Sequence, residues 1–83
     1  MRVTVKLFAA YRERAGKSDT ALELPDGSTV GFLAEEMVRL YPGLPRDASR
    51  LVVAVNRDYR RHGHTLQDGD EVALIPPVSG GVR

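Results

Sequence analysis

The chain has 83 residues, of which 42% are hydrophobic and 28% charged, and its net charge is +1. This length predicts one domain with a modest core, and the near-neutral charge gives no general attraction to nucleic acid or to a membrane surface. The absence of cysteine excludes disulfides, thiolate metal sites and sulfur carried on a side chain as a persulfide. No apolar run approaches the roughly 20 residues of a membrane span, and the start has no signal-peptide pattern, so a cytoplasmic location is expected.

The first quarter of the chain predicts a strand, a short helix and a second strand. Residues 1–8 alternate apolar with polar side chains, which is the period of a strand. Residues 9–15 are rich in helix formers, and Gly16 follows them as a typical helix stop. Residues 20–24 alternate again and end in Pro-Asp-Gly, which is turn chemistry.

The main helix follows this turn. Ser28 or Thr29 is expected to cap it, and Pro42 to follow its end. One face carries apolar side chains at helical spacing. These are Val30, Leu33, Ala34, Met37 and Tyr41.

The second half predicts three further strands. Residues 43–50 are interpreted as loop and residues 51–55, an unbroken apolar run, as a strand covered on both faces. Residues 56–58 are interpreted as a turn and 59–61 as a short edge strand. The last strand is residues 71–75, and it stops where prolines begin.

This order of elements predicts an α+β fold. One main amphipathic helix packed on a mixed sheet of four to five strands buries the apolar face of the helix and the apolar faces of the strands together. The arrangement expected is a roll of the β-grasp type, with the first and last strands side by side and parallel at the sheet centre.

No set of side chains predicts an active site. His62 and His64 could chelate a metal, but nothing nearby completes a ligand set, and a solvated loop is the preferred interpretation. The arginines beside them could contact nucleic acid, although a solvated hairpin or the rim of a protein interface is favoured. Asp68 and Asp70 are interpreted as turn residues, because no glutamate completes a calcium loop.

The chain end carries the strongest functional signal. Residues 1–77 are predicted to form the β-grasp domain and residues 78–83 a flexible tail that carries two glycines. Pro76 and Pro77 favour an extended backbone, from which the tail could reach roughly 15 Å beyond the sheet. Glycines lack a Cβ, so a narrow channel could close around such a backbone. The residues expected to be recognised are Pro76, Pro77, Val78, Ser79 and Gly80, with Gly81 as the reactive position.

Motifs along the whole chain resemble the small subunit of molybdopterin synthase (MoaD), in the MoaD/ThiS sulfur-carrier family of ubiquitin-like proteins. The most specific motif is Pro-Pro-Val-Ser-Gly-Gly at residues 76–81. The other motifs are residues 3–9, Arg12-Glu13, Ala15-Gly16, Ser28-Thr29-Val30, Tyr41-Pro42, residues 53–56 and residues 66–75.

This resemblance implies a function without catalytic side chains. It implies that Gly81 is adenylated and then thiocarboxylated, and that its sulfur passes to cyclic pyranopterin monophosphate in molybdenum cofactor biosynthesis. The implied partners are an E1-like, MoeB-type adenylyltransferase and a MoaE-type large subunit in a heterotetramer, with neither nucleic acid nor membrane. The chain itself would bind no cofactor or metal, since ATP would be used by the activating partner.

Two further expectations complete the hypothesis. The exposed sheet face and tail root are expected to form the partner interface, with Phe8, Leu74 and Pro76 as candidates. In the family the glycine pair normally ends the chain, whereas Val82-Arg83 follow Gly81 here. A precursor trimmed after Gly81 is the preferred explanation, and an atypical member, an artificial addition or a fusion remain open.

Three alternative functions are considered. They are a sulfur carrier for another acceptor, such as tRNA or thiazole, a ubiquitin-like protein modifier, and a plain interaction module.

Overall fold

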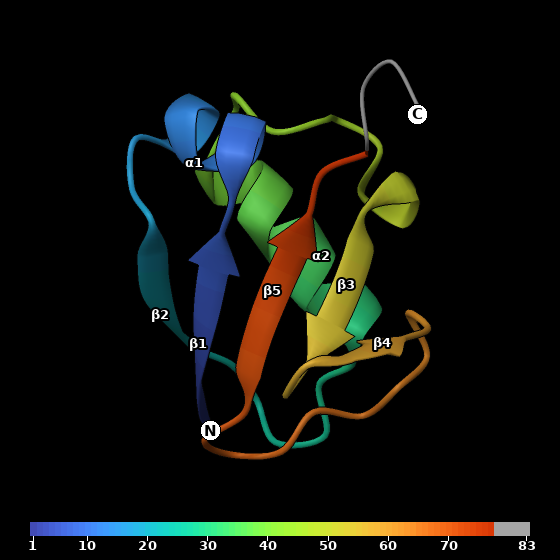
Figure 1. Ribbon diagram of the computed structural model, residues 1–83. Coiled ribbons are helices and arrows are strands. Elements are labelled where there is room, and N and C mark those ends of the chain that lie inside the picture. The colour runs from blue at the N-terminus through green and yellow to red at the C-terminus, as the bar shows by residue number, and fades with distance from the viewer. Residues whose placement is uncertain (78–83) are drawn as a thin grey trace.

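The computed structural model describes residues 1–77 (Figure 1). Five strands form one mixed sheet, and α2 crosses behind it as the main helix. The elements are β1 (Arg2–Leu7), α1 (Ala9–Ala15), β2 (Asp19–Glu23), α2 (Val30–Leu40), the 3-10 helix η1 (Ala48–Arg50), β3 (Val52–Val55), β4 (Asp58–Arg60) and β5 (Glu71–Ile75).

The strand order is β2-β1-β5-β3-β4. β1 pairs with β5 in parallel, and the remaining neighbours are antiparallel. The last strand therefore lies in the middle of the sheet beside the first, as predicted. This α+β arrangement is that of a β-grasp roll.

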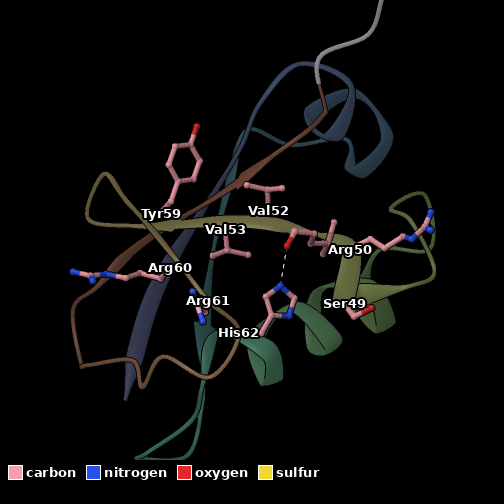
Figure 2. Close-up of a pocket in the computed structure, with 9 residues that line it drawn as sticks. Ser49, Arg50, Val52, Val53, Tyr59, Arg60, Arg61 and His62 are labelled. Atoms are coloured by element: carbon pink, nitrogen blue, oxygen red, sulfur yellow. Dashed lines mark hydrogen bonds between the residues drawn. The ribbon is translucent and has the colours of Figure 1, made fainter. Parts of the chain in front are cut away.

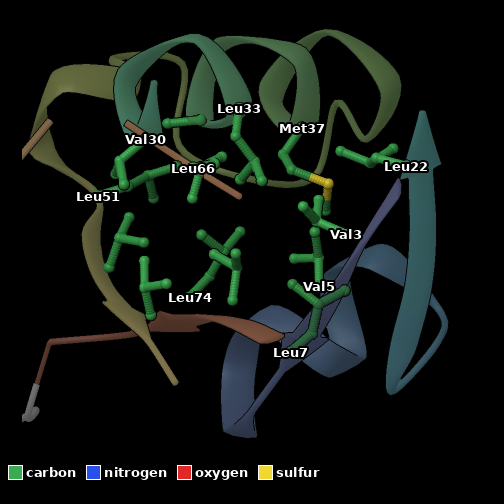
Figure 3. Close-up of a cluster of buried hydrophobic side chains, with 14 of the residues drawn as sticks. Val3, Val5, Leu7, Leu22, Val30, Leu33, Met37, Leu51, Leu66 and Leu74 are labelled. Carbon is green, nitrogen blue, oxygen red and sulfur yellow. The ribbon is translucent and has the colours of Figure 1, made fainter. Parts of the chain in front are cut away.

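The core lies between α2 and one face of the sheet (Figure 3), which we call the inner face. Alternation along each strand places its large apolar side chains there. The helical stripe of α2 meets them, and Val30, Leu33 and Met37 have no exposed surface. The strand residues of this core are Val3, Val5, Leu7, Leu22, Val53, Val55, Val72 and Leu74.

Local signals in the sequence fix the ends of both helices. The Thr29 side chain accepts a hydrogen bond of 3.2 Å from the Phe32 N–H and so caps α2. Gly16 ends α1 with a φ of 80°, in the left-handed region that suits glycine. Neither helix is long and apolar enough to span a membrane, within the part of the chain that the structure describes.

The segment before β3 differs from the prediction. Residues 43–50, interpreted as loop, contain η1, and the Asp47 carboxylate before it accepts a hydrogen bond of 3.1 Å from the Ser49 N–H. β3 is covered on the core side, but Val52 is 48% exposed, so the expectation of burial on both faces is wrong for that residue.

The hairpin after β3 is tighter than predicted. Asn56 and Arg57 both have positive φ, at 51° and 76°, and they form a two-residue connection between paired Val55 and Asp58. Two left-handed residues match the right-handed twist of the flanking strands. β4 therefore begins at Asp58, which the sequence analysis assigned to the turn.

Candidate functional site at the C-terminal end of the sheet

The end of β5 is held on both sides. Its last residues pair with β1 through Leu7–Leu74 and with β3 through Val52–Ile75. Pro76 and Pro77 follow at once and have no N–H to continue the ladder. The chain therefore leaves the sheet from its centre at a fixed point, which we call the tail root. The other predicted tail residues, Val78, Ser79, Gly80 and Gly81, and the predicted flexible segment 78–83 lie outside the described residues.

A cavity of about 300 Å³ lies beside the tail root. α1 supplies one wall, and the Tyr11 ring is almost fully buried there. Burial raises the pKa of the Tyr11 hydroxyl, and the nearby Arg14 guanidinium opposes this only in part. The site is thus a mainly apolar slot with one cationic side chain at its wall. Its lining residues are Ala10, Tyr11, Arg14, Pro45, Pro76 and Pro77.

The second surface at this end is the outer face of the sheet, opposite α2. In Figure 1 no described helix covers this face. On this face, Val52 of β3 is the register partner of Ile75 of β5. Ala54 of β3 is the register partner of Tyr59 of β4. Phe8 follows Leu7, the partner of Leu74, and therefore lies at the same end of the sheet. We call Phe8, Val52, Ala54, Tyr59 and Ile75 the outer apolar patch.

This patch has the properties of a contact surface. Phe8 is 45% exposed, and Tyr59 is 71% exposed. Ala54 is well covered but is not part of the inner core. Exposed apolar side chains gathered on one face mark a protein-binding surface more strongly than isolated ones do.

The structure corrects one of the predicted interface residues. Leu74 has no exposed surface and belongs to the inner core, so the prediction that placed it at a partner interface is wrong. Alternation along β5 directs Val72 and Leu74 inward and leaves Ala73 and Ile75 on the outer face. Phe8 and Pro76 lie at the same end of the sheet and stay predictions, and the outer face also carries Ile75, Val52 and Tyr59, which the sequence analysis did not name.

The polar side chains singled out in the sequence have structural roles. The His62 ring Nε2 lies 2.8 Å from the Leu51 carbonyl oxygen, so this ring is a partly buried bridge and not a solvated group. The backbone carbonyls of His62 and His64 accept from the N–H groups of Gly31 and Val30, and so satisfy the start of α2. Within residues 1–77, no group of three or more metal-ligating side chains is present.

The two aspartates hold the opposite end of the sheet. Asp70 is buried and accepts hydrogen bonds from Asn56 Nδ2 at 2.9 Å and from the Gln67 N–H at 2.8 Å. Asp68 accepts from the Arg2 N–H at 2.7 Å. Both are turn residues, as predicted. The chemical interest of the described structure therefore lies in the tail root and the surfaces around it.

The fold, with a diproline that ends a central strand, defines a ubiquitin-like β-grasp protein. The ThiS family model matches residues 5–81, which is almost the whole chain. The chain belongs to this family, the MoaD/ThiS family.

Two relatives show the kinds of protein to which this chain is similar. The molybdopterin synthase sulfur carrier subunit of Arabidopsis thaliana is 40% identical, over 98% of this chain and 84% of the relative. The small archaeal modifier protein 3 of Haloferax volcanii is 32% identical, over 98% of this chain and 100% of the relative.

Solved structures agree with the fold. SAMP1 from Haloferax volcanii superposes with a TM-score of 0.84 at 30% identity, covering 98% of this chain and 100% of that one. A chain in a complex of subunits 1 and 2 of the molybdopterin-converting factor from Helicobacter pylori superposes with a TM-score of 0.67. It covers 98% of this chain and 100% of that one, and at 23% identity it supports the fold alone.

Proposed function

We propose that this chain is a sulfur carrier of molybdenum cofactor biosynthesis whose reactive atom is the carboxyl carbon of Gly81. The observation that carries this proposal is the family match, which extends to residue 81 and therefore includes the whole Pro-Pro-Val-Ser-Gly-Gly ending. Near-full-length similarity to molybdopterin synthase sulfur carrier subunits supports the same function. The chain has no cysteine that could carry the sulfur instead.

The chemistry begins with activation of a poor electrophile. A free Gly81 carboxylate would attack the α-phosphorus of ATP on an E1-like adenylyltransferase, which releases pyrophosphate and leaves an acyl-adenylate. A sulfide-equivalent donor would then displace AMP, so that a carbon–sulfur bond replaces the carbon–oxygen bond to phosphate. The thiocarboxylate sulfur is a good nucleophile and needs no side chain of this protein to activate it.

The acceptor is cyclic pyranopterin monophosphate. Its conversion to a dithiolene requires two sulfur atoms, so two loaded carriers are used for each product. After transfer, water restores the Gly81 carboxylate. The partners would bind ATP and supply the catalytic groups. This chain would supply the Gly81 thiocarboxylate and place it in the partner's active site.

The large subunit of molybdopterin synthase is the proposed acceptor enzyme, in a heterotetramer. Support comes from the similarity to molybdopterin synthase sulfur carrier subunits and from the two-subunit Helicobacter pylori complex, one chain of which shares this fold. The outer apolar patch and the tail root offer the contact surface, since they lie at the same end of the sheet and Ile75 directly precedes Pro76. A partner seated there would receive the chain end directly.

Val82 and Arg83 lie beyond the family match. While Val82 is attached, the Gly81 carbonyl is part of an amide and cannot be adenylated. We therefore propose that activation requires removal of these two residues. Mass spectrometry of active protein from its native cell tests this step, because a mass that still includes both residues would contradict it.

The direct test compares two forms of the protein. A form that ends at Gly81 should gain about 16 Da when incubated with ATP, an E1-like enzyme and a sulfide source, because one oxygen is replaced by sulfur. The form that ends at Arg83 is the control and should remain unchanged. Failure of the shorter form to gain mass, with an activating enzyme shown to load another carrier, would overturn the proposal.

A ubiquitin-like protein modifier is the second candidate. The similarity to small archaeal modifier protein 3 favours it, and both functions begin with the same acyl-adenylate. They differ in the nucleophile that attacks the acyl-adenylate. For a modifier it would be a lysine amine of the target protein, and for a sulfur carrier it would be the sulfur donor. Isopeptide-linked, higher-mass species that disappear when Gly81 is deleted would favour the modifier, whereas thiocarboxylate without such species favours the carrier.

A further inference from the structure

A second hollow, of about 470 Å³, lies between the start of β3 and the end of β4 (Figure 2). It is separate from the cavity at the tail root and shares no residue with it. Two short segments line it, residues 49–53 and residues 59–62. We call it the β3–β4 cleft.

The cleft exists because the hairpin ladder ends early. Val53 and Arg60 are the last register pair of β3 and β4. Beyond them the chain turns away, and the His62 ring, in place of a backbone group, reaches the Leu51 carbonyl at 2.8 Å. The two strands therefore separate around the imidazole, and the separation leaves an open hollow at the sheet edge.

The cleft is cationic although the protein is almost neutral. Residues 46–64 contain five of the twelve basic residues and two of the eleven acidic residues. Three of these arginines, Arg50, Arg60 and Arg61, line the cleft. Their charge is not explained by the family function proposed above, which uses the chain end.

These guanidinium groups are poorly neutralised by the protein itself. Arg50 lies 3.8 Å from Asp47 and Arg60 lies 3.8 Å from Asp58, and both pairs are largely exposed. Exposed pairs at this separation are weak and do not hold the guanidinium in place. Arg61 forms no ion pair within residues 1–77.

The layout of the arginines indicates the shape of the ligand. Figure 2 shows Arg60 and Arg50 directed toward opposite ends of the cleft, with Arg61 between them. Groups that hold a single phosphate would converge on one point, whereas these are spread along a line. Tyr59 lines the cleft beside Val52, on the side away from Arg61 (Figure 2), and this one tyrosine ring is a single stacking surface, whereas single-stranded nucleic acid is held by several aromatic side chains along its bases.

We propose that the β3–β4 cleft binds an extended acidic segment of a partner protein. Carboxylates on such a segment complement the three arginines, and its apolar side chains can cover Val52, which is 48% exposed. Val52 is the register partner of Ile75, so the segment would lie next to the tail root.

The test uses a labelled short peptide of alternating Glu and Val and the full chain. Fluorescence anisotropy should show binding that weakens as salt rises, and peptide-induced amide shifts should fall on residues 49–53 and 59–62. The double variant Arg60→Glu/Arg61→Glu should lose at least about tenfold in affinity, because attraction becomes repulsion. The charge-matched control Arg12→Glu/Lys17→Glu lies near the opposite sheet edge and should bind like the unaltered protein.

Other outcomes overturn the proposal. An equal loss of peptide affinity in both double variants would indicate that the peptide is attracted by the net charge of the protein and does not bind a specific site. Equally tight binding of a single-stranded oligothymidine, or displacement of the peptide by inorganic phosphate at constant ionic strength, would indicate a general polyanion or small-anion site. None of these measurements involves ATP or Gly81, so the result is independent of the proposed sulfur chemistry.

Discussion

The two faces of the sheet are built from alternate residues of the same strands, and they have different roles. The inner face is packed against α2, and its apolar side chains are almost fully buried. The outer face carries Phe8, Val52 and Tyr59 with much of their surface exposed. Hydrophobicity on one face thus stabilises the domain, whereas hydrophobicity on the other is available to a partner, and a residue's position in the alternation decides which applies.

The largest effect on stability is expected from the inner face. Leu74→Ala removes a fully buried side chain and leaves a cavity, and it should lower the free energy of unfolding by ~2–5 kcal/mol. Urea denaturation followed by circular dichroism measures this. Val52→Thr on the outer face keeps a β-branched side chain and should change the value by less than about 1 kcal/mol. Equal losses in the two variants would contradict the distinction between the faces.

The outer face should dominate binding. Ile75→Asp places a carboxylate within the outer apolar patch, so its affinity for a molybdopterin synthase large subunit should fall at least about tenfold. Isothermal titration calorimetry with protein that ends at Gly81 checks this. Ser18→Asp adds the same charge in the exposed turn before β2 and should bind normally. If Ile75→Asp also binds normally, the outer apolar patch is not the interface.

The helix that covers the inner face can be weakened at its N-cap, the residue just before α2. Thr29→Ala removes the acceptor for the Phe32 N–H and should cost about 1 kcal/mol of folding stability. Thr29→Ser retains the hydroxyl oxygen and should recover most of the loss. Thermal or urea unfolding distinguishes the variants, and a loss of the same size for serine would show that the cap hydrogen bond is not the cause.

The smallest effect is expected from charges on the outer face. Lys6 Nζ lies 3.5 Å from the Glu71 carboxylate, and both side chains are nearly half exposed. Lys6→Met keeps most of the aliphatic stem and should change stability by no more than about 0.5 kcal/mol. The difference from the unaltered protein should vanish in concentrated salt. A large, salt-independent loss would mean that this face is more tightly packed than its exposure indicates.

Periodicity in the sequence was sufficient to predict the fold. Strict alternation at residues 1–8 and the helical stripe from Val30 to Met37 identified the two surfaces of the core. The central place of the last strand followed from the β-grasp pattern. The 3-10 helix η1 was missed because three residues are too few to carry a period.

The errors at the site have a common physical origin. Leu74 belongs to an apolar run, residues 72–75, and the two faces of a strand are hard to distinguish in such a run. Glu71 and Ala73, the more polar and smaller residues of the strand, were the available signal that Val72 and Leu74 face inward. The β3–β4 cleft could not be predicted, because it depends on where the ladder ends and on the contact between His62 and Leu51.

The position of β5 also has a consequence for the order of assembly. β1 and β3 do not pair with each other, and the sheet is joined only when β5 enters between them. Among the strands of residues 1–77, β5 is synthesised last, so a nascent chain that lacks residues 71–75 has β1 and β2 in one half-sheet and β3 and β4 in another. Pairing between β1 and β5 closes a loop that spans most of the polypeptide, which makes it a late step in folding. A partner that contacts the end of β5 and Pro76 together would therefore select chains in which the sheet has closed.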